Sequence, residues 1–315
     1  MTKSAIEELE ELVHGHMELN VPMHTLTTIR TGGPADLLIH PSDRTDLTNV
    51  MQFLHGRSIE VRAIGNASSV IVRDGGIRGA VVKLGTGFSS IEPAPDWSGN
   101  PQVRVDAGVQ MADLTEWTIK NGFGGLEFLS GIPGTLGGAI FSNSIGWGKT
   151  MGEMVASVEV MDTLGNILQV QHDDIGFSDR RTNLPPEFII LSATLTGEPR
   201  SPEQVEMMSR NFASRRHTNY PHGGECVGMV FRNSGGQTPE KLIEACGLKG
   251  VRVGDAEVSR LHANFIINLG NAESGNVISL IGMIQERVWV KYKIKLETAC
   301  TVLGNWQKSK VRIKE

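Results

Sequence analysis

The stretch GGLEFLSGIPGTLGGAIFSNSIGWG, residues 124–148, holds eight glycines in 25 positions and decides the fold. Glycine adopts positive φ readily and lets a backbone approach a ligand closely. A second stretch, AIGNASSVIV at residues 63–72, is typical of a strand, a tight turn and another strand. Consecutive turn residues can aim several backbone N–H groups into one concavity that suits phosphate oxygens. Composition alone leaves two interpretations open: tight turns in a sheet protein, or such an anion-binding nest.

Two common nucleotide-binding patterns are absent from both stretches. Neither has GxGxxG at a strand-to-helix junction with an acidic residue about 20 positions later, so a Rossmann fingerprint is excluded. The pattern GxxxxGK[ST] is also absent, which argues against a P-loop. Ser68, Ser69 and Thr135 add small hydroxyl donors to the two stretches instead.

The bulk composition limits the class of protein. The 315 residues carry a net charge of −5, with 39% hydrophobic and 21% charged residues, as in ordinary globular proteins. This balance predicts neither a nucleic-acid partner nor a membrane partner. No apolar run approaches the ~18 residues that a membrane span needs. The acidic N-terminus is unlike a secretory signal, and the basic residues 305–315 are expected to form a solvated tail.

The cysteines give information about metal sites and compartment. Cys226, Cys246 and Cys300 lie far apart, with no CxxC and no Cys/His spacing for zinc. We therefore expect no metal site. An odd, sparse set of cysteines is typical of free thiols in a reducing compartment, so we expect a cytoplasmic protein.

Periodicity divides the chain into three blocks. A helix is expected at residues 4–17, and the next block, to about residue 85, follows the order strand, helix, strand, which indicates a small parallel unit. Residues 80–198 have alternating strands and few helices, which predicts a mostly antiparallel sheet. From about residue 200 the pattern is α+β, with capped helices beginning near Ser201 and Thr238, and a long helix after residue 275.

The order of several segments resembles a known family. TIRTGGPAD, IGNASSVIVRDGG, VDAGV, LEFLSGIPGTLGGA, HANFIIN and the closing LETACTVLG are similar in sequence and order to the UDP-N-acetylenolpyruvoylglucosamine reductases, the MurB flavoenzymes of peptidoglycan precursor synthesis. The resemblance covers roughly residues 20–304, and the GIPGTLGGA segment is highly specific for it. The chain is similar to the shorter, type II form of the family.

This resemblance implies an α+β fold, in which a two-subdomain FAD-binding module of the vanillyl-alcohol oxidase type precedes an α+β substrate-binding domain. It implies FAD and NADPH as cofactors and a UDP-sugar as the small-molecule substrate. The expected boundaries are an N-terminal helix at 1–19, FAD-binding subdomains at 20–85 and 86–198, a substrate-binding domain at 199–304 and the basic tail at 305–315.

The resemblance also implies which residues contact FAD. The family pattern GxGSN occurs here as Gly-Asn-Ala-Ser-Ser, where Ala67 narrows backbone freedom and Ser69 replaces an amide, so FAD affinity is expected to be lower. The implied FAD contacts are Arg30, Gly65, Asn66, Ala67, Ser68, Ser69, Gly131, Ile132, Gly134, Thr135, Gly137, Gly138 and Ala139.

The family reaction needs a positive group and a proton donor. Hydride passes from NADPH to FAD and then to C3 of an enolpyruvyl ether, which places charge on the substrate carboxylate and leaves C2 in need of a proton. By resemblance, Arg180 in FSDRRT takes the position of the family arginine. An exposed arginine at a strand start is the alternative interpretation, and Asp179 beside it could compete for the guanidinium.

The proton donor of the family has no counterpart at its usual position. By resemblance, Met229 occupies the serine position and Ala299 the glutamate position. A thioether carries no proton to donate. Two compensations stay open: the Cys226 thiol as an acid, or Glu297, which a strand would direct to the same side as residue 299.

The substrate residues implied by the resemblance are Arg215, Arg216, Arg232 and Asn233. His262 and Asn264 match the family as well, although a structural role is the alternative, and Trp147 stands where the family has tyrosine. The sequence favours a MurB-like reductase with an altered proton-donor apparatus. A catalytically impaired FAD- and UDP-sugar-binding paralogue, or a flavin oxidoreductase with another substrate, remains open.

Overall fold

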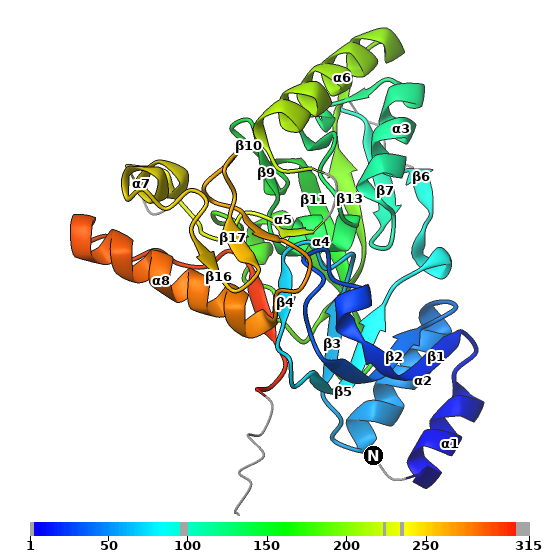
Figure 1. Cartoon of the computed structure of the whole chain (residues 1–315). Coiled ribbons are helices and arrows are strands. Elements are labelled where there is room, and N and C mark those ends of the chain that lie inside the picture. The colour runs from blue at the N-terminus through cyan, green and yellow to red at the C-terminus, as the bar shows by residue number, and fades with distance from the viewer. Residues whose placement is uncertain (1–2, 95–99, 223–224, 234–235, 307–315) are drawn as a thin grey trace, which may run out of the picture. The chain divides into compact units, whose positions relative to one another are not determined.

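The computed structural model describes residues 3–94, 100–222, 225–233 and 236–306, and confirms the expected α+β class (Figure 1). The chain divides into two compact units, each built from separate stretches of sequence. Unit 1 comprises Met1–Met17, Leu38–Ala67 and Val81–His222. Unit 2 comprises Glu18–Leu37, Ser68–Ala80 and Gly223–Glu315. The domain boundaries expected from the sequence stay predictions.

The first helix is shorter than predicted. It spans α1 (Lys3–Leu12), and strand β1 (His16–Pro22) occupies the rest of the expected helix. The buried carboxylate of Asp46 explains the difference, because it accepts hydrogen bonds from the backbone N–H groups of His14 and Gly15 at 3.0 and 2.9 Å. These donors are thereby drawn out of a helical path. The prediction of a helix to residue 17 was wrong because the residue that ends the helix, Asp46, lies 32 residues after His14 in the sequence.

The next elements contain the predicted amphipathic helix. Helix α2 (Arg44–Gly56) is capped by the Asp43 side chain, and buries Leu47, Val50, Met51 and Leu54, as its spacing indicated. A four-stranded sheet has the order β1-β2-β5-β3. Its other strands are β2 (Pro34–His40), β3 (Val61–Ile64) and β5 (Ile77–Lys83).

An antiparallel sheet forms the centre of unit 1, as predicted for residues 80–198. Its order is β12-β11-β13-β7-β6, and every neighbouring pair is antiparallel. The strands are β6 (Ile91–Pro93), β7 (Gln102–Asp106), β11 (Val155–Met161), β12 (Ile167–Gln171) and β13 (Ile189–Thr196). One face carries the apolar core of the unit, in which strand residues such as Val105 and Leu195 pack with Leu114, Phe128 and Ile140.

Helices and short elements complete unit 1. The helices are α3 (Met111–Asn121), α4 (Leu136–Phe141), α5 (His172–Ile175) and α6 (Pro202–Asn219), and the 3₁₀ turns are η2 (Thr86–Phe88), η3 (Glu127–Leu129) and η4 (Gly152–Met154). Strand β9 (Ile145–Gly146) forms a short hairpin with β10 (Lys149–Thr150), and β8 (Phe123–Gly124) pairs antiparallel with the distant β14 (Glu198–Pro199).

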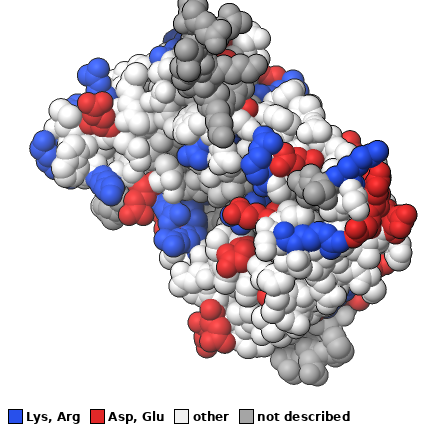
Figure 2. Space-filling model, turned by 90° about the horizontal axis from the view of Figure 1, so that it is seen from below, with Lys and Arg blue, Asp and Glu red and all other residues white. Residues whose placement is uncertain are grey.

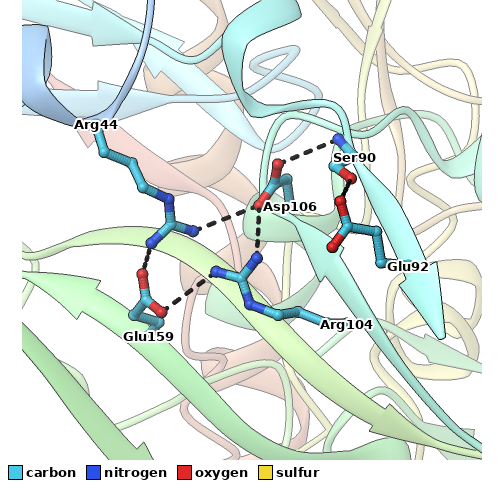
Figure 3. Close-up of polar contacts among 6 residues, drawn as sticks. All are labelled: Arg44, Ser90, Glu92, Arg104, Asp106 and Glu159. Atoms are coloured by element: carbon cyan, nitrogen blue, oxygen red, sulfur yellow. Dashed lines mark hydrogen bonds and ion pairs between the residues drawn. The ribbon is translucent and has the colours of Figure 1, made fainter. Parts of the chain in front are cut away.

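Four charged side chains tie α2 to the antiparallel sheet within unit 1 (Figure 3). Arg44 of α2 pairs with Glu159 of β11, and its guanidinium lies 3.5 Å from the Asp106 carboxylate of β7. Arg104 completes the ring, at 3.8 Å from Asp106 and 3.3 Å from Glu159. Because the two carboxylates are mostly buried, each needs a cationic partner, and the alternating charges supply one to each.

Unit 2 has its own core and a small sheet of order β15-β18-β17-β16. Its strands are β15 (Cys226–Val227), β16 (Arg252–Val253), β17 (Ala256–Val258) and β18 (Ile266–Asn268), and its helices are α7 (Pro239–Ala245) and α8 (Ser274–Tyr292). Further along, β19 (Thr301–Leu303) pairs in parallel with β4 (Val70–Val72). The remaining short 3₁₀ turn is η1 (Met23–Thr25).

Surface charge and helix length complete the description. On the face drawn in Figure 2, lysine and arginine side chains are interspersed with aspartate and glutamate, and they do not gather into one large basic field. Within the described residues, no helix combines the length and apolarity needed to cross a membrane.

Candidate functional site

Residues Gly131–Ala139, here called the glycine segment, are fixed by backbone contacts within unit 1. The Met111 N–H donates to the Gly134 carbonyl at 3.0 Å, and the Gly137 N–H donates to the Ala107 carbonyl at 2.9 Å. Gly131 and Gly134 have φ of 79° and 130°, which favour glycine strongly. Thr135 then caps helix α4, with its hydroxyl accepting from the Gly138 N–H at 3.4 Å.

The turn after β3 meets the glycine segment. A Cβ atom placed on Gly65 would lie only 2.3 Å from the Thr135 hydroxyl oxygen, so a side chain here would displace that hydroxyl. The Asn66 amide donates to the Gln110 side chain at 2.5 Å, and Ala67 has a positive φ of 48°. The two glycine-containing stretches are distant in the sequence. The fold nevertheless brings Gly65 and Asn66 beside Thr135 and Gln110 in unit 1.

The resulting surface has the donor set that a dinucleotide pyrophosphate requires. In the described part of the chain, the backbone N–H groups of Asn66, Ala67, Gly134 and Thr135 donate no loop or turn hydrogen bond to another backbone group. Ala67 and Thr135 are buried. The buried Ser130 hydroxyl, next to Gly131, is likewise without a hydrogen-bond partner among these residues. Backbone donors grouped around glycines suit phosphate oxygens, so the residues present fit FAD.

Arg180 lies on a strained two-residue turn. Ser178 and Arg181 exchange backbone hydrogen bonds at 2.9 and 3.2 Å, and Arg180 between them has φ of 50°. Non-glycine residues adopt this conformation rarely, and they do so mostly where surrounding structure imposes it. Burial lowers the pKa of the Arg180 guanidinium, and the neighbouring Asp179 and Tyr220 oppose that effect. The arginine is therefore half-buried and held in an unusual backbone conformation.

The turn with Arg180 is anchored to the end of the glycine-rich stretch. The Asn143 amide donates to the Ser178 carbonyl at 2.8 Å, and its oxygen accepts from the Gly152 N–H at 2.8 Å. The Thr182 hydroxyl donates to the Phe141 carbonyl at 3.3 Å. Residues just after the glycine segment thus position the Arg180 turn in unit 1.

Helix α6 brings two more predicted arginines to the same unit. The Arg215 guanidinium lies over the Trp147 ring at 4.2 Å, and Trp147 stacks on Phe212 at 6.2 Å. Arg216 lies over the Tyr220 ring at 4.9 Å. A Cβ atom on Gly131 would be 3.3 Å from Cδ of Arg216, so this arginine lies directly beside the glycine segment.

In unit 2, residues 226–233, here called loop 226–233, are clamped by Asn264. Its side-chain oxygen accepts from the Phe231 N–H and its amide donates to the Phe231 carbonyl, both at 2.9 Å. The Val230 N–H donates to the Asn264 carbonyl at 3.0 Å. The neighbouring His262 accepts from the Asn264 N–H at 3.3 Å and lies 3.3 Å from the Glu240 carboxylate. Asn264 and His262 therefore hold backbone in place.

The two positions without a proton donor lie on adjacent segments. The Ala299 N–H donates to the Val230 carbonyl at 2.7 Å, and the Arg232 N–H donates to the Glu297 carbonyl at 2.9 Å. Met229 is half-buried and immediately precedes Val230, whereas the side chain of Glu297 is exposed. Glu297 contributes its backbone to this pairing.

Five of the other expected site residues also lie in unit 2. Arg30 has φ of 54° and its guanidinium pairs with Glu225 at 2.9 Å, immediately before loop 226–233. The backbone carbonyl of Ser68 accepts from the Gly228 N–H at 3.0 Å, and the backbone carbonyl of Ser69 accepts from the Thr301 N–H at 2.9 Å. Asn233 is exposed, and the Arg232 Nε is buried without a hydrogen-bond partner in the described chain.

Sequence reasoning missed several residues that shape these sites. Gln110, Ser130 and Asn143 belong to no motif that signals binding. Only their positions beside VDAGV and within the glycine-rich stretch could have drawn attention to them. Among the described residues, no group of three or more His, Cys, Asp or Glu side chains could hold a metal ion.

Two protein-family models match the two parts of the chain that contain these residues. A model of the FAD-binding domain matches residues 35–171, which contain both glycine stretches. A model of the UDP-N-acetylenolpyruvoylglucosamine reductase C-terminal domain matches residues 219–303. The expectation of an FAD-binding module, with FAD as cofactor, is confirmed.

Whole-chain relatives carry the same enzyme name. The UDP-N-acetylenolpyruvoylglucosamine reductase of Desulforamulus reducens is 35% identical, over 94% of this chain and 97% of its own length. The enzyme of Bacillus subtilis is 32% identical, over 96% and 99%. The crystal structure of UDP-N-acetylenolpyruvylglucosamine reductase from Thermus caldophilus superposes with a TM-score of 0.77 at 30% identity, covering 92% of this chain and 99% of that one.

Proposed function

Since the chain belongs to the UDP-N-acetylenolpyruvoylglucosamine reductase family, we propose that it reduces UDP-N-acetylglucosamine enolpyruvate to UDP-N-acetylmuramate with electrons from NADPH. The family relation makes it an FAD-dependent oxidoreductase of peptidoglycan synthesis. The observation that carries the proposal is Arg180, which is half-buried on a strained turn anchored to the end of the glycine-rich stretch. The three free cysteines fit a reducing, cytoplasmic setting.

Bound FAD supplies the hydride, and the protein's own groups bind, orient and stabilise the charge that develops. The backbone donors near Ala67 and Thr135 would hold the pyrophosphate, with Gly65 and Gly131 allowing its close approach. Arg215 and Arg216 provide two positive groups for the substrate diphosphate.

Arg180 has the properties needed to stabilise the substrate carboxylate as charge develops on it. A partly desolvated guanidinium interacts more strongly with an anion than an exposed one does, because the effective dielectric constant is lower. Its turn is preorganised by Asn143 and Thr182, so little rearrangement is required. Asp179 next to it partly neutralises this charge, so its effect on a substrate is reduced.

Met229 and Ala299 carry no acidic proton, which favours slow protonation of the product. Losing a positioned acid typically costs ~10²–10⁴ in rate. This observation also supports a second candidate, a protein that binds FAD and a UDP-sugar with impaired chemistry, or one that reduces another substrate. We place the reductase first because the charge-stabilising and cofactor-binding groups are retained.

One anaerobic experiment separates these functions. Purified protein is checked for bound flavin, NADPH is added, and then UDP-N-acetylglucosamine enolpyruvate. Bleaching of the flavin by NADPH and its recovery with the enolpyruvate substrate support the reductase. Bleaching without recovery supports another substrate, and flavin that NADPH does not bleach supports a non-catalytic role.

Matched variants sharpen this experiment. We expect Arg180→Met to slow recovery of the flavin by ~10²-fold, because an oriented charge is lost. The neighbouring Arg181 is exposed, so Arg181→Met serves as the control and is expected to recover at the wild-type rate. Equal recovery rates for the two variants would contradict the role of Arg180.

A further inference from the structure

Reduction of the enolpyruvyl double bond consumes one hydride and one proton. The hydride forms the C–H bond at C3, and a proton must form the C–H bond at C2. Neither Met229 nor Ala299 can supply that proton, yet the backbone around both is well defined in unit 2. The proton must therefore come from another acidic hydrogen near these two residues.

Ser69 is bonded to both segments that carry the two substitutions. Its carbonyl accepts from the Thr301 N–H at 2.9 Å, two residues beyond Ala299. The preceding carbonyl, of Ser68, accepts from the Gly228 N–H at 3.0 Å, one residue before Met229. The 68–69 turn thus joins loop 226–233 to the 299–301 segment within unit 2.

The Ser69 hydroxyl points toward loop 226–233. Its Oγ lies 3.4 Å from the position that a Cβ atom on Gly228 would occupy. Among the described residues, Oγ makes no side-chain hydrogen bond, and Ser69 is only half-buried. The hydroxyl is consequently available for a ligand beside the Gly228–Met229 peptide. Glycine at position 228 leaves it uncovered.

Other acidic hydrogens nearby are less suited. Cys300 is buried, with its Sγ directed at the Val230 carbonyl at 3.9 Å, and burial raises the pKa of its thiol to about 11. Cys226 begins the short strand β15, where its backbone pairs with that of Ile267 in β18. Thr301 carries a hydroxyl but its side chain is exposed.

We propose that Ser69 is the catalytic proton donor of this protein, taking the part that Met229 cannot play. This proposal rests on the proposed reductase function. The Ser69 O–H bond breaks as the proton bonds to C2, and the alkoxide left on Oγ recovers a proton from solvent water. Bound FAD, once reduced by NADPH, would supply the hydride at C3, so that electrons and protons balance.

The test follows both half-reactions in the FAD-loaded protein. We expect Ser69→Ala to slow reoxidation of the reduced flavin by the enolpyruvate substrate by ~10²-fold or more. Reduction of the flavin by NADPH is expected to stay at the wild-type rate. Thr301→Val is the matched control, because it removes a hydroxyl from the same cluster while keeping the backbone bond to Ser69, and it should reoxidise normally.

A rescue and a binding measurement distinguish chemistry from structure. Adding Met229→Ser to Ser69→Ala should restore at least ~10-fold of the lost rate, since a serine hydroxyl returns to the loop. Titration of the Ser69→Ala apoprotein with FAD should show a loss of affinity too small to account for the loss of rate. A loss of FAD affinity that accounts for the whole rate loss would overturn the proposal, because Ser69 would then serve only the cofactor.

The remaining outcomes are also decisive. If wild type reoxidises with the substrate and Ser69→Ala does so equally fast, Ser69 is not the donor and the proposed function stands. If the wild-type flavin is bleached by NADPH but never recovers with the substrate, the proposed function fails. The assignment of Ser69 falls with it.

Discussion

The glycine segment of unit 1 and loop 226–233 of unit 2 are held in different ways. The glycine segment is fixed by its own backbone, by positive φ at Gly131 and Gly134, and by contacts too close for a side chain at Gly65. Loop 226–233 is fixed from outside, by the amide of Asn264 and by backbone bonds to residues 297 and 299.

This difference explains where chemistry can change. In loop 226–233 the bonds that define the path use backbone atoms, so the side chain at 229 can be exchanged without moving the loop. At Gly65 even one methyl group has no room. Position 65 in the cofactor region is therefore restricted to glycine, whereas the loop can lose or gain a proton donor while its fold persists.

The largest expected effect is on the cofactor side. Gly65→Ala should lower FAD affinity by ~10²-fold or more, because the new Cβ displaces the Thr135 hydroxyl that caps α4 and so disturbs the neighbouring donors. Flavin absorbance after titration of the apoprotein measures this. Gly56→Ala is the control, since a Cβ there meets nothing within 4 Å. Wild-type affinity in Gly65→Ala would remove the contrast between the two regions.

An effect on stability, and not on cofactor affinity, is expected from the external clamp of the loop. Asn264→Ala leaves the buried N–H and carbonyl of Phe231 without partners, which should lower the free energy of unfolding by about 2–4 kcal/mol. Urea unfolding measures it, with exposed Asn271→Ala as the control. FAD affinity should be little changed, because Asn264 contacts loop 226–233 and not the glycine segment. If Asn264→Ala loses FAD and keeps its stability, this assignment is wrong.

The smallest expected effect concerns pH. The raised pKa of Cys300, about 11 against 9.0 for a free thiol, means that the folded protein favours the neutral thiol. This stabilisation is complete below pH 9 and is lost as pH rises toward 11. Between pH 7 and 10 the stability difference between wild type and Cys300→Ala should narrow by about 1 kcal/mol in urea unfolding. If the stability difference between wild type and Cys300→Ala stays constant over this pH range, burial does not raise the pKa of the Cys300 thiol.

Local patterns in the sequence predicted elements whose signals are also local. Helix α2 follows from Asp43 as its cap and from the spacing of Leu47 to Leu54. Helix α6 follows from Ser201, which forms a capping box with Gln204, and from Pro202 at the first helical position. The antiparallel sheet of residues 91–196 was likewise visible as alternating strands.

Features that depend on distant partners were not predictable. The end of α1 is set by Asp46, and the contact of Gly65 with Thr135 joins two stretches with no shared pattern. For the site, the FAD-binding stretches were recognisable by their glycines and their order. The strained turn of Arg180 and the position of the Ser69 hydroxyl beside Gly228 required coordinates, because φ and side-chain proximity leave no mark in composition.

The parallel pairing of β19 with β4 bears on how the protein is made. Val70, in the first quarter of the chain, pairs with Thr301 near its end. The Ser69 carbonyl accepts a hydrogen bond from the N–H of the same threonine. Bringing such distant segments together carries a loop-closure cost that is met late in folding. During synthesis on the ribosome, unit 2 can close only after residue 303 has emerged. A chain released early would leave β4 without its strand partner, and an unpaired strand edge is prone to aggregation.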